Sequence, residues 1–176
     1  MTEQIEKGRS ELEYIDSVLD TVSRAESERE LAQIREELTE QGYLRKQKGK
    51  QRPQAALPPL EFTSSDGFKI LVGRNNTQND KLTLKIANKN DMWLHTKDIH
   101  GSHTVVFAEG REISDTAILE AAQLAAYYSK ARESSQVPVD YTLVRYVSKP
   151  SGARPGMVIY VNNKTVYVTP KANISE

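Results

Sequence analysis

Apolar residues near the start of the chain recur at intervals of three and four, and no proline occurs before Pro53. The first run is Leu12, Ile15, Leu19 and Val22, and the second is Leu31, Ile34 and Leu38. This spacing puts apolar side chains on one stripe of a helix. Few apolar residues separate the two runs, so we predict one helix from about residue 3 to Ser23 and another from about Ser27 to Gln41. Gly42 suits the position after the second helix, where glycine readily adopts a positive φ.

A helix with so narrow an apolar stripe is only marginally stable by itself in water. The stripe needs a partner: another helix of an antiparallel coil, the rest of this chain, or a second copy. We therefore expect coiled-coil pairing, and a dimer is one way in which this chain achieves it.

Charge and composition divide the chain into three parts. Residues 1–44 carry five basic and twelve acidic side chains, and residues 45–176 carry nineteen and twelve, so the net charges are −7 and +7. We assign residues 1–44 to the end of a helical arm. Residues 45–59 form a linker in which the basic run RKQKGKQR precedes PQAALPP, whose prolines favour extended chain. The linker is either a tether or a strap that binds phosphate, and residues 60–176 form the module behind it.

Short β-prone runs and two helical patterns alternate through the module. The predicted strands are 60–63, 68–73, 92–95, 104–108, 141–147, 157–161 and 165–169. One predicted helix begins at Asn79 or Asp80, and another runs from Ser114 to about Ala131, each starting at a side chain that can cap its first turn. Short turns between consecutive strands indicate a mostly antiparallel sheet with the helices on one face. The fold class is therefore α+β, preceded by the helical arm.

The residue content excludes several classes of function. Cysteine is absent, which rules out disulfides and thiolate chemistry and agrees with a cytoplasmic protein. The first residues lack the apolar core of a signal peptide, and no apolar run reaches the roughly 18 residues of a membrane span. Neither a phosphate-binding loop nor a nucleophile elbow occurs, so we predict a non-enzymatic protein without a cofactor.

Four stretches carry a family resemblance. They are VGRNNTQND (Val72–Asp80), DMWLHTKDIHGSH (Asp91–His103), AAYYSKARESSQVPVDYT (Ala125–Thr142) and KPSGARPGMVIY (Lys149–Tyr160). In this order they resemble the NFACT-R domain, over about Phe62 to Pro170. That domain closes the proteins of the RqcH and NEMF family, which includes the streptococcal fibronectin/fibrinogen-binding proteins. The preceding residues resemble the end of the coiled-coil arm of the same proteins. His100 departs from the family pattern, which has proline at that position.

The resemblance implies a ribosome-associated quality-control factor. Such proteins bind the large ribosomal subunit when peptidyl-tRNA obstructs it, and they support alanine tailing of the stalled chain. The expected partners are the large subunit, tRNA and rRNA, and the expected location is the cytoplasm. Streptococcal members are also described as adhesins exported by a non-classical route. A fibronectin- or fibrinogen-binding module at the cell surface is therefore the alternative.

Three residues of the second stretch suggest an RNA-binding surface. Trp93, His95 and Lys97 alternate along a predicted strand and would share one face. A tryptophan there can stack on unpaired bases, and a lysine can meet phosphate. Met92 and Leu94 would face the core. The alternative is that Trp93 itself is a core residue whose ring N–H is bonded internally.

Polar and basic side chains on the predicted loops complete the candidate nucleic-acid site. These candidates are Arg74, Asn75, Asn76, Asn79, Ser102, His103, Arg132, Lys149 and Arg154. The first four lead into a helix N-terminus, which attracts anions, although turn and capping chemistry also explains them. Arg132 lies near a helix C-terminus, where a cation also offsets the helix dipole.

A metal site is the remaining alternative. His95, Asp98, His100 and His103 lie within nine residues, but the chain lacks a helical His-x-x-x-His spacing. A loop of this kind leaves the ligand geometry undefined, so we predict no metal.

Overall fold

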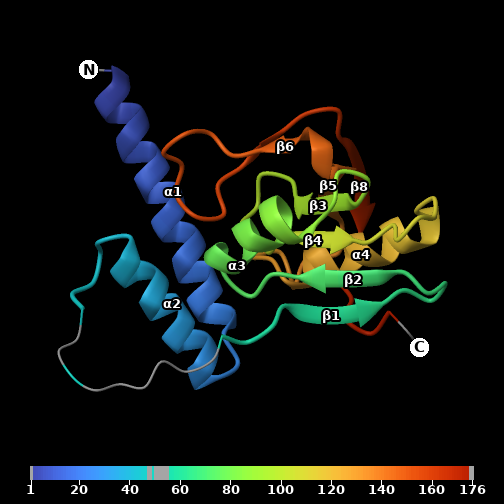
Figure 1. Ribbon diagram of the computed structural model, residues 1–176, viewed down its shortest axis with the longest axis horizontal. Coiled ribbons are helices and arrows are strands. Elements are labelled where there is room, and N and C mark those ends of the chain that lie inside the picture. Colours follow the sequence, from blue (N-terminus) through green and yellow to red (C-terminus); the bar gives the residue numbers. More distant parts are fainter. Residues whose placement is uncertain (1, 47–48, 50–55, 175–176) are drawn as a thin grey trace.

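The structure is a computed structural model that describes residues 2–46, 49 and 56–174. A helical hairpin packs along one side of a sheet module (Figure 1). The helices are α1 (Thr2–Arg24), α2 (Glu28–Glu40), α3 (Asn76–Lys81) and α4 (Asp115–Tyr127), with a π-helical turn η1 (Leu82–Ile86) and a 3-10 turn η2 (Val144–Tyr146). None of the described helices is long and apolar enough to cross a membrane.

Antiparallel pairing organises the module. The strands are β1 (Leu60–Thr63), β2 (Lys69–Val72), β3 (Met92–Thr96), β4 (Thr104–Val106), β5 (Val137–Leu143), β6 (Val147–Ser148), β7 (Ile159–Tyr160) and β8 (Lys164–Val168). Six of them form one sheet in the order β1-β2-β4-β3-β5-β8, and every neighbouring pair is antiparallel. Strands β6 and β7 form a separate two-stranded ribbon. The predicted α+β class with a mostly antiparallel sheet is confirmed.

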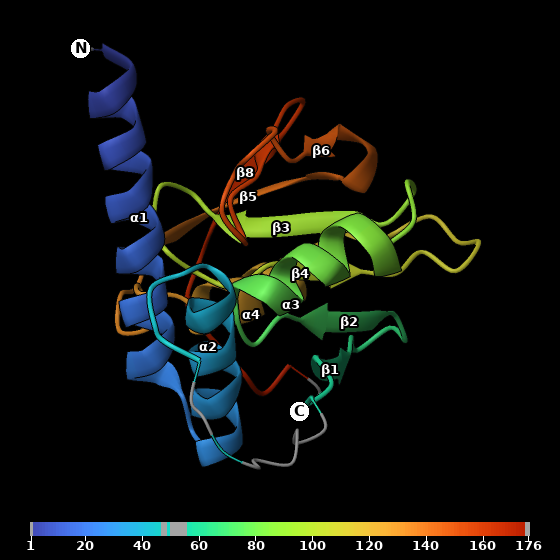
Figure 2. The ribbon, with the colours of Figure 1, turned by 60° about the vertical axis from the view of Figure 1, so that its left-hand side comes forward.

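Both faces of the sheet are covered, which the sequence analysis did not predict. Ile70 and Val72 face the alanine-rich side of α4, whereas Leu71 faces a second cluster with Leu82 of η1 and Val147 of the ribbon. Figure 2 shows α3 and η1 in front of the central strands and α4 behind them. The expectation of helices on one face only is wrong because the central strands β2 and β4 are buried at consecutive positions. Strands covered on both faces lose the alternation of apolar and polar residues.

The helical hairpin agrees with the sequence prediction. Ser27 caps α2 by accepting a hydrogen bond from the Glu30 N–H, and Gly42 follows the helix with φ +85°. The packing seam is only partly the predicted one. Tyr14, Val18 and Ile34 form the buried contact, while the predicted stripe residues Leu12 and Leu19 remain exposed.

Several element boundaries differ from the prediction, and the turn η2 interrupts the predicted strand 141–147. Helix α3 begins at Asn76 with Asn75 as its cap, so the predicted start at Asn79 or Asp80 is wrong. Helix α4 ends at Tyr127, because the following residues bond the 100–102 loop through Lys130 N–H to the His100 carbonyl and through Ser102 N–H to the Tyr128 carbonyl. Strand β5 starts four residues earlier than predicted. Its Asp140 is buried there because Tyr160 and Thr165 donate hydrogen bonds to it.

The predicted basic linker lies largely outside the described residues. Positions 47–48 and 50–55 belong to it, so the choice between tether and phosphate-binding strap stays a prediction.

Candidate nucleic-acid interface

The start of α3 is closed by a carboxylate of the helical arm. Glu37 of α2 accepts hydrogen bonds from the backbone N–H and the hydroxyl of Thr77, at 2.8 and 2.9 Å. Its other carboxylate oxygen accepts a hydrogen bond from the Tyr14 hydroxyl at 2.6 Å. Burial and the neighbouring carboxylate raise the pKa of Tyr14. The anion that the sequence analysis expected here is therefore the side chain of Glu37.

Two of the predicted RNA-contacting arginines also bind the arm. The Arg74 guanidinium lies 2.6 Å from the Glu30 carboxylate and donates to the Pro58 carbonyl at 2.7 Å. Arg154 lies 3.4 Å from the Glu11 carboxylate and donates to the Gln41 side chain at 3.0 Å. The side chains of Arg74 and Glu30 are only 18% and 15% exposed, so this pair is largely shielded from solvent.

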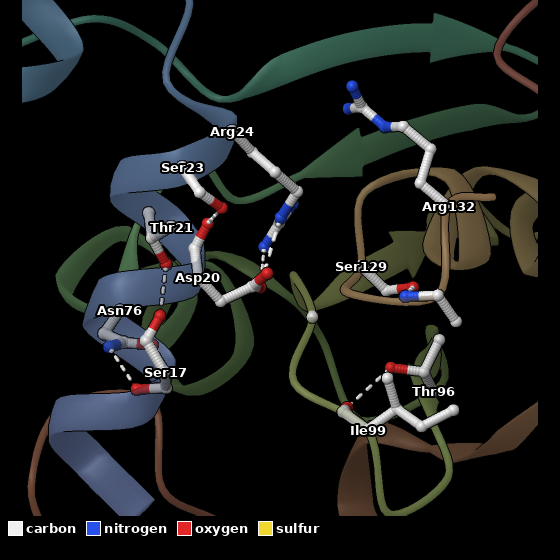
Figure 3. Close-up of polar contacts among 12 residues, drawn as sticks. Ser17, Asp20, Thr21, Ser23, Arg24, Asn76, Thr96, Ile99, Ser129 and Arg132 are labelled. Atoms are coloured by element: carbon white, nitrogen blue, oxygen red, sulfur yellow. Dashed lines mark hydrogen bonds and ion pairs between the residues drawn. The ribbon is translucent and has the colours of Figure 1, made fainter.

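The predicted asparagines lie at or beneath the contact between arm and module. Asn75 caps α3 and donates to the Gln33 side chain of α2 at 3.3 Å. The Asn76 amide donates to the Ser17 hydroxyl of α1 at 3.0 Å (Figure 3). Asn79 is buried, and its side-chain amide oxygen accepts a hydrogen bond from the backbone N–H of His103. These three asparagines hold loops and helices together in the folded chain.

Trp93 is a core residue, so the alternative interpretation is confirmed in its burial and the exposed row of Trp93, His95 and Lys97 is wrong at this position. It is 1% exposed, stacked against His95 with ring centroids 5.7 Å apart, and in contact with Tyr160 at 4.7 Å. The alternation along β3 is real, but the face that holds Trp93 is covered by the ribbon and η1. Its ring N–H has no hydrogen-bond partner among the described residues, contrary to the internal bond that the alternative interpretation expected.

The two histidines of this cluster are held by backbone carbonyls. His103 is buried, its Nε2 lies 3.1 Å from the Gly156 carbonyl and its Nδ1 lies 2.8 Å from the Thr83 hydroxyl. A carbonyl can only accept, so Nε2 carries the proton and Nδ1 accepts from Thr83. Burial, with nearby His95 adding to it, lowers the pKa of His103 to about 3. Burial also lowers the pKa of His95, whose ring nitrogens face the Thr96 and Gly101 carbonyls.

The histidine-rich loop does not gather a ligand set. No group of three or more His, Asp or Glu side chains among residues 2–46, 49 and 56–174 is placed to hold a metal ion. The ring nitrogens of His95 and His103 are already directed at protein oxygen atoms. Neighbouring oxygen atoms thus take the directions in which these rings would coordinate an ion.

The remaining predicted residues are scattered. Lys97 is exposed, whereas Ser102 is buried and its N–H bonds the Tyr128 carbonyl. Arg132 donates to the Tyr127 carbonyl, and its guanidinium lies 4.1 Å from the centre of the Tyr127 ring. Lys149 forms an ion pair with Asp80. The predicted residues therefore do not form one cationic rim.

A groove of about 880 Å³ lies between α1, the 97–101 loop and the 150–160 loop. Its walls carry charges of both signs, including Lys7, Glu11, Asp98 and Arg154. Such a mixture does not select a polyanion.

The sequence analysis missed a second group of cations. They lie on the outer, solvent-exposed side of the elements that cover the second face of the sheet. Residues 81–90 contain three lysines and no acidic residue, and residues 141–175 contain five basic residues and no acidic residue. Lys81, Lys85, Lys89 and Arg145 are exposed, and none forms an ion pair with a carboxylate within the described part of the chain. We call these four residues the basic face. The signal was present in the sequence as two long acid-free segments.

The fold brings these two segments together. Leu82, between Lys81 and Lys85, packs in the same cluster as Val144, which precedes Arg145. The Arg145 side chain donates to the Lys89 carbonyl at 3.4 Å and also to the Asn90 amide oxygen. The positive charges at the end of α3, in η1, in the segment after it and in η2 therefore lie on elements that pack together.

Comparisons with known proteins agree with the resemblance seen in the sequence. The family described as NFACT protein RNA binding domain matches residues 59–162, and the NFACT N-terminal and middle domains match residues 1–56. The Rqc2 homolog RqcH of Bacillus subtilis is 49% identical over 174 residues, and that of Streptococcus suis is 44% identical over 171 residues. Both alignments cover 97% of this chain, which spans only 30% of the length of either relative.

A solved structure is also similar. The C-terminal part of the fibronectin/fibrinogen-binding protein from Streptococcus suis superimposes with a TM-score of 0.90 at 43% sequence identity. The match covers 97% of this chain and 68% of that structure. The likeness therefore includes both the helical hairpin and the module.

Proposed function

The chain belongs to the NFACT family of RNA-binding domains, and from that premise we propose that it is a non-enzymatic RNA-binding module of a ribosome-associated quality-control factor. In the whole protein it helps to hold the large ribosomal subunit obstructed by peptidyl-tRNA, and so supports alanine tailing in the cytoplasm. Its RNA partners are rRNA, tRNA or both.

The observation that carries this proposal is the basic face. Four exposed cations lie on elements that pack together, and the two segments that supply them contain no acidic residue. A polyanion gains from such a surface because its phosphates displace counterions without meeting repulsive carboxylates. The predicted residues Arg74 and Arg154 are already paired with carboxylates of the arm, so they contribute less to this attraction.

The test is a charge-matched comparison of two triple variants. Lys81, Lys85 and Lys89 are changed to glutamine in one protein, and the exposed Lys97, Lys130 and Lys171 are changed to glutamine in the other. Binding to purified large subunits and to RNA is measured over a range of salt concentrations. We expect the first variant to bind more weakly and to depend less on salt. On single strands, the slope of log affinity against log salt should become shallower by about 0.7 for each phosphate that is no longer neutralised.

The control variant has the same net charge but should bind RNA nearly as well as the parent chain. Equal losses in both variants would show that overall charge matters and that the basic face does not. A larger loss of RNA affinity in the control variant would indicate that RNA binds near Lys97 instead. Either result contradicts the proposed location.

A second candidate function rests on the similar solved structure, which belongs to a fibronectin/fibrinogen-binding protein. In this alternative the module binds fibronectin or fibrinogen at the cell surface. An interface built on apolar burial should depend little on salt, whereas RNA binding should weaken steeply as salt rises. Side-by-side titration with fibronectin and with large subunits separates the two functions.

A further inference from the structure

We propose that the β6–β7 ribbon beside the basic face binds unpaired RNA nucleotides, with Tyr146 as a stacking platform. This inference rests on the proposed RNA-binding function and deepens it, because it specifies single-stranded rather than duplex RNA. The ribbon supplies apolar and aromatic surface, while Arg145 and Lys89 supply positive charge.

The register of the ribbon determines which side chains face outward. Val147 pairs with Tyr160, and both pack toward Trp93 and Leu82 beneath the ribbon. Side chains alternate along a strand, so the neighbouring positions point the other way. Within the ribbon the outward positions are Ser148 and Ile159; Tyr146, the last residue of η2, and Val161 directly adjoin it, and all four residues are exposed. The Val161 N–H bonds the Tyr146 carbonyl, which extends the ribbon by one more pair.

The outward side is unusually apolar for a solvent-facing surface. Ile159 and Val161 are each 59% exposed, and Tyr146 is 37% exposed. The register and the bond between Val161 and Tyr146 bring these three exposed residues, which we call the apolar strip, to neighbouring backbone positions. Scattered exposed apolar residues are ordinary, but adjacent ones indicate a surface that binds a partner.

Charge selects the class of partner. Arg145 directly precedes Tyr146, and its guanidinium is fixed by the Lys89 carbonyl and the Asn90 side chain. This geometry brings the backbone of Lys89 to the same edge of the ribbon, and residues 141–175 contain no acidic side chain; the nearby Asp98 lines the groove on the side of Ile159. An apolar strip bordered by the fixed Arg145 matches a nucleotide, which combines a flat apolar base with a phosphate.

The apolar strip also distinguishes single strands from duplexes. In a duplex the base faces are stacked on each other, and the surface consists of phosphates, sugar hydroxyls and base edges. Only unpaired nucleotides offer their faces to an aromatic ring. A purely cationic surface would bind both forms, whereas Tyr146, Ile159 and Val161 add affinity only for the unpaired form.

The experiment measures fluorescence anisotropy of a labelled unstructured RNA, and of the same RNA annealed to its complement, with the full chain. We expect tighter binding to the single strand. Tyr146→Ala should weaken single-strand binding by about 5- to 150-fold, which is the usual effect of removing one aromatic ring that stacks on a base, and Tyr146→Phe should restore it. The matched control is Tyr167→Ala, which removes a tyrosine that is 64% exposed on β8 and should have little effect.

The outcomes separate the inference from the function on which it rests. Equal binding to single strand and duplex, with Tyr146→Ala equal to Tyr167→Ala, overturns the inference but leaves RNA binding intact. A chain that binds neither RNA form overturns both. Weaker binding to fibronectin in Tyr146→Ala, with RNA affinity unchanged, would assign the strip to a protein partner and also overturns the inference. Thermal unfolding of each variant shows whether a loss reflects misfolding. If the alanine variant is unstable, the comparison of single strand with duplex on the unchanged chain still tests the inference.

Discussion

A carboxylate oxygen of Glu37 lies 2.8 Å from the backbone nitrogen of Thr77, and this contact joins the helical arm to the first turn of α3. Glu37 is only 3% exposed, and both of its oxygens accept hydrogen bonds. Arg74 with Glu30 and Arg154 with Glu11 continue the same interface on either side. The acidic arm and the basic module are therefore complementary within one chain.

Replacing Glu37 with alanine should destabilise the interface between arm and module. Tyr14 and Thr77 would each lose a buried acceptor, and an unsatisfied buried polar group costs about 1–3 kcal/mol. Urea denaturation should show a loss of that order, and the Thr77 amide should exchange faster with solvent. Glu36→Ala is the matched control, because Glu36 is an exposed neighbour on α2 and its loss should change stability by at most about 0.5 kcal/mol. Similar stabilities of the two variants would contradict the structural role of Glu37.

Arg74→Ala should affect stability more than RNA affinity. The change leaves the mostly shielded Glu30 carboxylate without its cation, and we expect the free energy of unfolding to fall by about 1–2 kcal/mol. Lys97→Ala removes an exposed lysine and should be nearly neutral for folding. Chemical denaturation and RNA titration of both proteins provide the check. If Arg74→Ala keeps full stability but loses RNA binding, the arginine contacts RNA directly.

Glycine is required at position 156 for two reasons. Its φ is +80°, and a Cβ atom there would lie 2.5 Å from the side-chain oxygen of Asn76. Gly156→Ala should therefore lower the free energy of unfolding by about 2–4 kcal/mol. Gly152 has a similar φ of +76° but open space around it, so Gly152→Ala isolates the backbone cost of about 1 kcal/mol. Equal melting temperatures for the two variants would show that the loop does not approach Asn76 as closely as described.

Acid should destabilise the module through His103. Its pKa is about 3 in the folded chain and about 6.5 when unfolded, so below pH 6.5 the unfolded state binds a proton that the folded state does not. Stability is then complete above about pH 6.5 and falls by about 1.4 kcal/mol for each pH unit until about pH 3. Burial of His95 acts in the same direction.

Urea midpoints measured between pH 7.5 and 5 test this dependence on pH. His103→Gln keeps a donor that can reach the Gly156 carbonyl but cannot titrate, so its stability should fall less steeply with acid. A His103 ring that titrates above pH 6 by NMR in the folded protein would disprove the explanation.

The periodic parts of the fold could be predicted from the sequence alone. The 3,4 spacing located α1 and α2, and Ser27 with Gly42 marked the ends of α2 correctly. The antiparallel sheet followed from short strands joined by turns. These features depend on local spacing and capping, which neighbouring residues determine.

The candidate site was harder to predict because it depends on residues that are distant in the sequence. Alternation along β3 placed Trp93 and His95 on one face, but it could not show that the ribbon and η1 cover that face. Similarly, the sequence marked Arg74 as a cation but did not show that Glu30, 44 positions away, lies against it. The acid-free segments could have identified the basic face, because the lack of nearby carboxylates is visible in the sequence.

The docked arm has a mechanical consequence. Helix α1 has 23 residues, which gives it a length of about 35 Å. It forms hydrogen bonds with the module in its middle turns, at Glu11 and Ser17, whereas its first turns extend beyond them. A tilt of about 10° about these residues would move the far end of the helix by roughly 2 to 4 Å. A contact that shifts the module would thus be transmitted as a swing of the arm.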